Sequence, residues 1–127
     1  MPLTNKPDWQ WRFKIAEKIC SCLDFQKFDV KGFYIFGSVK NATAGPASDI
    51  DILIHFCGNK KQEDNLLMWL DGWSQALAEI NKQKTGYSID GLLDVHLVTD
   101  EDIKNKTSFA VKIGAISDAA RPLKVID

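Results

Sequence analysis

This 127-residue sequence lacks the marks of membrane-spanning, disulfide-stabilised and strongly basic proteins. Its apolar runs fall well short of the ~20 residues that a membrane-spanning helix needs. Three cysteines are too few for a disulfide framework, which is typical of a reducing compartment. The formal net charge of −1 gives no overall positive field to attract nucleic acid. The N-terminus has no apolar stretch typical of a signal peptide, so we expect a cytoplasmic protein with no membrane partner.

Length and composition indicate one globular domain. The chain is 45% hydrophobic and 26% charged, and it is long enough to bury a core without covalent staples. Residues 1–7 carry two prolines and little apolar content, so we expect a loose N-terminal arm. The domain itself is expected to span residues 8–127.

Apolar periodicity predicts a helix over about 8–24, with Asp8 as its N-cap. Its inward apolar stripe is expected to comprise Trp9, Phe13, Ala16, Cys20 and Leu23. Trp11 is expected to lie on the flank of the helix. A second helix is expected over about 61–82, with a stripe of Leu66, Trp69, Leu70, Trp73, Leu77 and Ile80.

Short sequence signals set the ends of the later elements. Asn59 and Gln62 can form a capping box before the second helix, and Gly86 ends it. Thr99 and Asp102 cap a short helix near 100–106. Apolar runs predict strands over about 30–36, 49–56 and 92–99, whereas the pattern leaves 107–127 unassigned.

This order predicts an α/β (α+β) fold in which helices pack on a small mixed sheet. The linking segment 39–48 is rich in Ala, Gly, Asn and Thr, and reads as a loop with at most one helical turn. It is too short for a crossover helix, so the first two strands are expected to pair antiparallel.

Three acids are expected to share one face of this sheet. Gly37-Ser38 closes the first strand, and Asp49 and Asp51 open the second, where side chains at i and i+2 point the same way, roughly 7 Å apart. Asp94 lies on the matching face of the third strand. Carboxylates brought together repel unless a cation separates them, and oxygen ligands favour magnesium, with manganese as the alternative.

Each of these residues also has a plainer interpretation. Gly37-Ser38 can form an ordinary turn, and Asp49 can simply end a loop as part of a turn. Asp94 can face water at a sheet edge. His55 and His96 share the acid face but lack a second ligand at zinc spacing. We interpret both histidines as groups that support the acids or as edge residues.

Residues 33–56, FYIFGSVKNATAGPASDIDILIHF, resemble the DNA polymerase β-like nucleotidyltransferase superfamily, and its minimal single-domain members in particular. The resemblance implies the nucleotidyltransferase fold and transfer of a nucleoside monophosphate from a nucleoside triphosphate, with ATP favoured and the acceptor unknown. It implies catalytic, metal-binding roles for Asp49, Asp51 and Asp94 at a two-metal magnesium site. It also implies that Gly37 and Ser38 bind phosphate.

One short segment departs from that family pattern. Many minimal members carry an arginine and then a glycine three and four positions after the serine, where this chain has Asn41 and Ala42. Lys40, one position earlier, is interpreted as a phosphate contact. The departure leaves a second hypothesis open, in which the fold is a nucleotide-binding or protein-binding module with weak or no turnover.

The resemblance also bears on partners. Minimal nucleotidyltransferases often pair with a small helical toxin-like protein, whose tyrosine is a candidate acceptor; a homodimer and a nucleic-acid acceptor stay open. Residues 87–123, notably LLDVHLVTDEDI and KIGAISDAARPL, resemble a nucleotidyltransferase-like module that accompanies phosphoenolpyruvate-synthase-type enzymes. That second resemblance implies a link to pyruvate or phosphoenolpyruvate metabolism. An aminoglycoside-modifying enzyme shares the motif, but nothing in the sequence encodes a sugar pocket.

Overall fold

The computed structural model describes residues 7–115 and 118–126, so all of the expected N-terminal arm except Pro7 lies outside the described residues. The elements follow in the order α1 (Asp8–Cys22), α2 (Phe25–Phe28), β1 (Val30–Phe36), α3 (Gly37–Lys40), β2 (Ile50–Phe56), α4 (Lys60–Thr85), β3 (Leu93–Val98), α5 (Asp100–Asn105), the 3-10 helix η2 (Ser108–Lys112) and β4 (Arg121–Val125).

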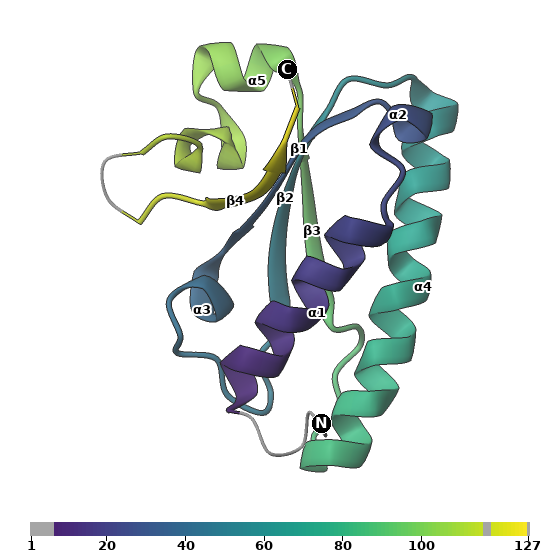
Figure 1. Ribbon diagram of the computed structural model, residues 1–127, viewed down its shortest axis with the longest axis vertical. Helices are drawn as coiled ribbons and strands as arrows, with labels where there is room; N and C mark the ends of the chain where they lie inside the picture. Colours follow the sequence, from purple (N-terminus) through teal and green to yellow (C-terminus); the bar gives the residue numbers. More distant parts are fainter. Residues whose placement is uncertain (1–6, 116–117, 127) are drawn as a thin grey trace.

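Within the described residues, one mixed sheet has the strand order β3-β2-β1-β4. β1 pairs antiparallel with both β2 and β4, whereas β2 and β3 run parallel. α1 and α4 lie together over one face of the sheet, and α5 lies at the other side with the η2 segment (Figure 1). The expected mixed sheet with packed helices, and its antiparallel β1–β2 pair, are confirmed.

The main core fills the space between the sheet and the two long helices. The side chains of β2 alternate between the two faces of the sheet, and Ile50, Ile52 and Ile54 are fully buried against α1 and α4. Leu93, Val95 and Leu97 of β3 pack against the same core. Because successive strand residues point to opposite faces, this alternation leaves Asp51 and Asp94 on the other side of the sheet.

A second, smaller core covers part of that other face. Leu53 and Val98 are buried there against residues from β1 and from the C-terminal region: Tyr34, Phe36, Ala110 and Ala120. The acids therefore lie at the edge of an apolar cluster rather than on a bare sheet surface.

The start of α1 differs from its prediction. Pro7 occupies the N-cap position without a side-chain cap, and Asp8 is the first helical residue, so the expected Asp8 cap is wrong. The assignment of the tryptophans is also reversed, because Trp11 is 2% exposed whereas Trp9 is only partly buried. The reason is the charged Arg12, which occupies an inward position and so turns the buried face toward Trp11.

The predicted capping box of α4 and the predicted cap of α5 are both confirmed. Asn59 accepts a hydrogen bond from the Gln62 amide at 2.9 Å and its own amide donates to the Gln62 side chain at 2.9 Å. Thr99 and Asp102 form the same motif before α5. The predicted stripe of α4 is wrong at Ile80, which is 41% exposed. The next residue, Asn81, is fully buried in its place.

β4 has no counterpart in the sequence prediction. Its five residues, Arg121–Val125, are mostly exposed and carry a proline, so neither apolar alternation nor β propensity marks them. It forms because the edge of β1 offers unpaired backbone groups, and an edge strand tolerates proline. In the parts of the chain that the structure describes, no helix is long and apolar enough to cross a membrane.

Candidate active site

The Gly37-Ser38 turn and Asp51 form one compact unit. In the antiparallel β1–β2 pair Phe36 lies opposite Asp51, so the next residue, Gly37, lies beside the Asp51 side chain. Gly37 has a φ of 72°, and a Cβ placed on it would collide with the Asp51 carboxylate. Glycine is therefore required here both by backbone conformation and by the approach of the acid.

The parallel register brings Asp94 to the same point. Asp51 pairs directly with Asp94 across β2 and β3, so their side chains emerge together from one face. Ligand atoms of Asp51, Asp94 and His96 all lie within 4.8 Å of one another. The His96 Nε2 atom is 3.1 Å from the Asp94 Oδ2 atom.

His96 has a more central place than its sequence interpretation gave it. Its ring packs 4.0 Å from the ring centroid of Phe109 and 5.8 Å from that of Phe36. These contacts fix the imidazole so that its nitrogen faces Asp94. The two-residue spacing from Asp94 was the signal that places both on one face, but Phe109 comes from a segment that the pattern left unassigned.

The beginning of β3 is fastened to α4. The Leu92 and Leu93 amides donate to the backbone oxygen and the hydroxyl of Ser74, both at 3.0 Å. A side chain on Gly91 would collide with that hydroxyl. This attachment sets where β3 starts and therefore where Asp94 lies.

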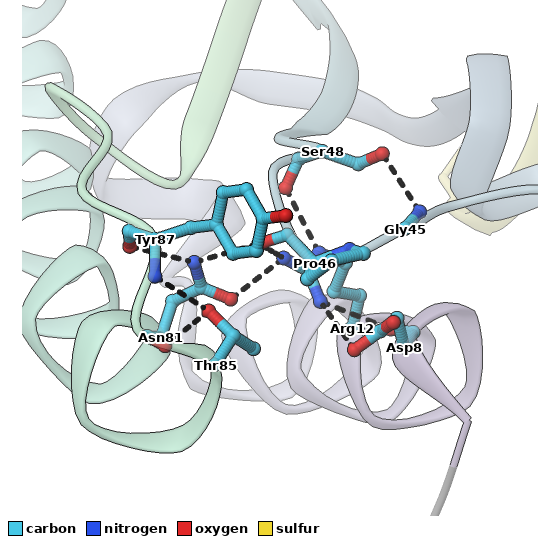
Figure 2. Close-up of polar contacts among 8 residues, drawn as sticks. All are labelled: Asp8, Arg12, Gly45, Pro46, Ser48, Asn81, Thr85 and Tyr87. Atoms are coloured by element: carbon cyan, nitrogen blue, oxygen red, sulfur yellow. Dashed lines mark hydrogen bonds and ion pairs between the residues drawn. The ribbon is translucent and has the colours of Figure 1, made fainter.

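Asp49 stands just before β2 and lies outside the three-residue group of ligand atoms within 4.8 Å. The loop leading to it is held by Arg12, a fully buried residue of α1 (Figure 2). The Arg12 Nε donates to the Ser48 carbonyl at 2.9 Å, and Nη2 donates to the Pro46 carbonyl at 3.3 Å. The guanidinium thus fixes the two carbonyls that precede the acid.

Asn81 of α4 completes this anchor. Its Oδ1 accepts from Arg12 Nη2 at 2.7 Å, and its Nδ2 donates to the Pro46 carbonyl at 3.0 Å (Figure 2). Sequence reasoning missed Arg12 and Asn81, because a stripe built from apolar residues assigns polar ones to the surface. The available signal was that Arg12 lies at i−4 from Ala16 on the inward face.

The comparison with known families agrees with this geometry. The model of the family described as a nucleotidyltransferase domain matches residues 14–116, most of the chain. The chain belongs to this nucleotidyltransferase domain family. Neither the curated proteins nor the solved structures contain a significant match. Family membership supports nucleotidyl transfer as the general activity, and the matched range contains both the Gly-Ser turn and the acids.

Burial and charge repulsion together raise the pKa values of two acids in this nucleotidyltransferase domain. Burial, the charge of Asp49 and the hydrogen bond and charge of Asp94 raise the pKa of Asp51 to about 7. Burial, followed by the charge of Asp94, also raises the pKa of Asp49. Without a counterion, the folded domain therefore holds a proton among its acids near neutral pH.

The residues present fit a divalent cation. Carboxylate oxygens suit magnesium or manganese, and the imidazole nitrogen of His96 is a third potential ligand beside them. A cation placed among Asp51, Asp94 and His96 would relieve the repulsion that raises the Asp51 pKa. The chemistry of the acid cluster is therefore compatible with a divalent metal, and the nucleotidyltransferase family typically uses divalent metals.

The two remaining predicted phosphate contacts differ in their surroundings. Ser38 is half-buried in α3, and its carbonyl accepts from the Thr43 amide at 2.8 Å. Lys40 is held by the C-terminal region, because its Nζ lies 3.1 Å from Asp118 Oδ1 and 2.9 Å from the Ala119 carbonyl. Asn41 also donates to Asp118, at 3.2 Å. The phosphate-binding roles of Ser38 and Lys40 stay predictions.

Proposed function

We propose that this nucleotidyltransferase domain is a magnesium-dependent enzyme that transfers a nucleoside monophosphate from a nucleoside triphosphate to a hydroxyl acceptor. ATP is the first candidate donor, and manganese is the alternative ion. The observation that carries the proposal is the convergence of Asp51, Asp94 and His96 beside the glycine turn. A cytoplasmic location belongs to the same proposal.

Each residue has a role in this proposal. Asp49 and Asp51 would hold two ions, and Asp94 would hold the one nearer the acceptor. When bound, the ions stabilise charge on the attacking and the departing oxygen. Gly37 lets the triphosphate approach the backbone, and Ser38 offers a hydroxyl and an amide to its outer phosphates.

The chemical step is a displacement at the α-phosphorus. The acceptor hydroxyl oxygen bonds to that phosphorus, the bond to the bridging oxygen breaks, and pyrophosphate leaves. Asp94 takes the acceptor proton. The His96 nitrogen, 3.1 Å from Asp94, orients the carboxylate and can receive the proton next.

The proposed acceptor is a protein hydroxyl, with a tyrosine of a small helical partner as the first choice. Support comes from the resemblance of residues 33–56 to minimal nucleotidyltransferases, which often pair with a small helical toxin-like protein. Adenylylation of a second copy of the chain and transfer to a nucleic acid are the alternatives.

A nucleotide-binding or protein-binding module with weak or no turnover is the second candidate function. Lys40, the cation nearest the Gly-Ser turn in the sequence, is engaged by Asp118 and the Ala119 carbonyl. The family's arginine and glycine are replaced by Asn41 and Ala42. Both features favour a weakened grip on the triphosphate.

The deciding experiment is calorimetric titration of a nonhydrolysable ATP analogue, with magnesium and then with chelator, into wild type and Asp51→Asn. The proposal expects binding that needs magnesium and is lost in the variant. Such a result would justify a search for the acceptor among proteins encoded next to this gene. Absence of binding to wild type would favour a protein-binding module instead.

A further inference from the structure

A second cluster of metal-binding side chains lies on the same face of the sheet, at the far end of the β2–β3 pair. His55 lies near the end of β2, Cys57 directly follows it, and Asp100 begins α5. The parallel register pairs His55 with Val98, so two residues further on the strands lead to Cys57 and Asp100. Ligand atoms of the three residues all lie within 4.8 Å of one another.

The distances match the spacing between donors around a tetrahedral zinc ion. Cys57 Sγ lies 3.6 Å from His55 Nε2 and 3.6 Å from Asp100 Oδ1. With Zn–S near 2.3 Å and Zn–N or Zn–O near 2.0–2.1 Å, tetrahedral geometry separates sulfur from either lighter donor by about 3.6 Å. The His55–Asp100 pair, at 2.6 Å, is hydrogen-bonded and needs to open to about 3.3 Å.

The arrangement does not suit a nucleophilic cysteine. In a Cys-His-Asp relay the carboxylate binds one ring nitrogen and the thiol faces the other. Here Asp100 Oδ1 and Cys57 Sγ both approach the same atom, His55 Nε2. The ligand atoms of all three side chains lie close together, as the ligands of one bound cation must.

We propose that His55, Cys57 and Asp100 bind one zinc ion, with water as the fourth ligand. A sulfur, a nitrogen and an oxygen donor select zinc over magnesium, which prefers oxygen ligands alone. Binding releases the thiol proton to solvent and replaces the His55–Asp100 hydrogen bond with two metal bonds. The ion joins the end of β2 to the start of α5.

This zinc site is independent of the proposed nucleotidyl transfer. It lies two strand positions beyond Leu53, on the other side of the small apolar core from Asp51 and Asp94. Its failure would leave the catalytic proposal intact, and loss of transfer would leave the zinc site intact.

The first test is zinc titration of the Asp51→Asn/Asp94→Asn double variant, in which the acid cluster no longer competes. We expect one zinc ion per chain. Adding Cys57→Ser or His55→Ala should weaken binding by at least ~10-fold, since each removes a ligand. Cys22→Ser is the matched control, because Cys22 is exposed and distant in sequence, and it should bind as the parent does.

A second measurement uses the wild-type chain and needs no variant to fold. Zinc at saturation should slow alkylation of Cys57 and leave the alkylation rate of Cys22 unchanged, as read by peptide mass spectrometry. Cobalt in place of zinc should give a thiolate-to-metal charge-transfer absorption. Equal alkylation of Cys57 with and without zinc, or zinc affinity unchanged by Cys57→Ser, would overturn the proposal.

Discussion

Ala42 adopts a left-handed backbone conformation, with a φ of 61°, in the turn after α3. A Cβ in this region costs roughly 1 kcal/mol that glycine does not incur. Ala42→Gly should therefore raise the free energy of unfolding by about 0.5–1 kcal/mol, measured as a higher urea midpoint at unchanged m-value. Ala47→Gly, at an exposed position without positive φ, should give no gain. A lower midpoint for Ala42→Gly would contradict the strain argument.

Asp51 is the residue where catalysis and stability are opposed. Asp51→Asn removes a proposed metal ligand, so nucleotidyl transfer should fall by at least ~100-fold. The same change removes repulsion, so the metal-free variant should melt at or above the wild-type temperature. Radiolabelled transfer and thermal unfolding measure the two effects. Glu79→Gln, an exposed carboxylate on α4, is the control and should change neither.

The same residue predicts a pH dependence. Burial, Asp49 and Asp94 raise the Asp51 pKa to about 7 from 3.8, so the folded metal-free protein keeps a proton that the unfolded chain releases. That contribution is complete below about pH 4 and is lost as the pH rises through 7. Without divalent ions, unfolding free energy should fall by on the order of 2 kcal/mol between pH 5 and 8, after discounting for solvent screening.

Asp51→Asn tests this dependence directly. Its urea midpoint should vary less with pH over the same range, because asparagine does not titrate. An equal slope in both proteins would show that another group is responsible.

At the scale of elements, α1 serves the site through one buried side chain. Arg12 donates to carbonyls of the loop before Asp49, and Arg12→Met would leave the Ser48 carbonyl and the Asn81 side-chain oxygen without this donor. We expect a loss of about 3 kcal/mol or more in unfolding free energy, measured by urea denaturation. Lys18→Met on the exposed side of the same helix should stay within about 0.5 kcal/mol. A similar loss in both variants would place the effect in α1 itself.

Elements with local signals were predictable from the sequence, and those formed by tertiary contacts were not. The capping boxes of Asn59 and Thr99 depend on residues three apart, and the second half of β1, residues 33–36, is a continuous apolar run. The inward turn of Arg12 depends on carbonyls more than thirty residues away. β4 depends on the open edge of β1, which no property of its own residues reveals.

At the scale of the whole molecule, the sheet divides two cores of unequal size, and the acids lie on the side of the smaller one. The convergence of Asp51 and Asp94 could be predicted because strand alternation fixes the face of each acid. The cover on that face could not, since Phe109, Ala110 and Ala120 belong to a region without a periodic pattern. The acids at the centre of the site were therefore predictable from the pattern of their own strands, whereas the residues that cover them come from a distant segment of the chain.

Divalent ions should stabilise the whole fold through this site. Ligand binding to the folded state adds about 2.7 kcal/mol at a hundredfold excess over the dissociation constant. Magnesium with a nonhydrolysable ATP analogue should raise the wild-type melting temperature, and chelator should reverse the rise. Asp51→Asn should show no rise in differential scanning fluorimetry. An identical rise in the variant would locate binding elsewhere.

The in-register pairing of β2 with β3 limits how this chain can change across generations. Insertion or deletion of one residue between Asp51 and His55 would turn all later residues of β2 to the opposite face. His55 and Cys57 would then be turned away from Asp100, whereas Asp51 would stay beside Asp94. In this part of β2, only insertions or deletions that keep each side chain on its present face of the sheet leave both clusters intact. Related sequences should therefore preserve the lengths of these strands more strictly than the identities of their apolar residues.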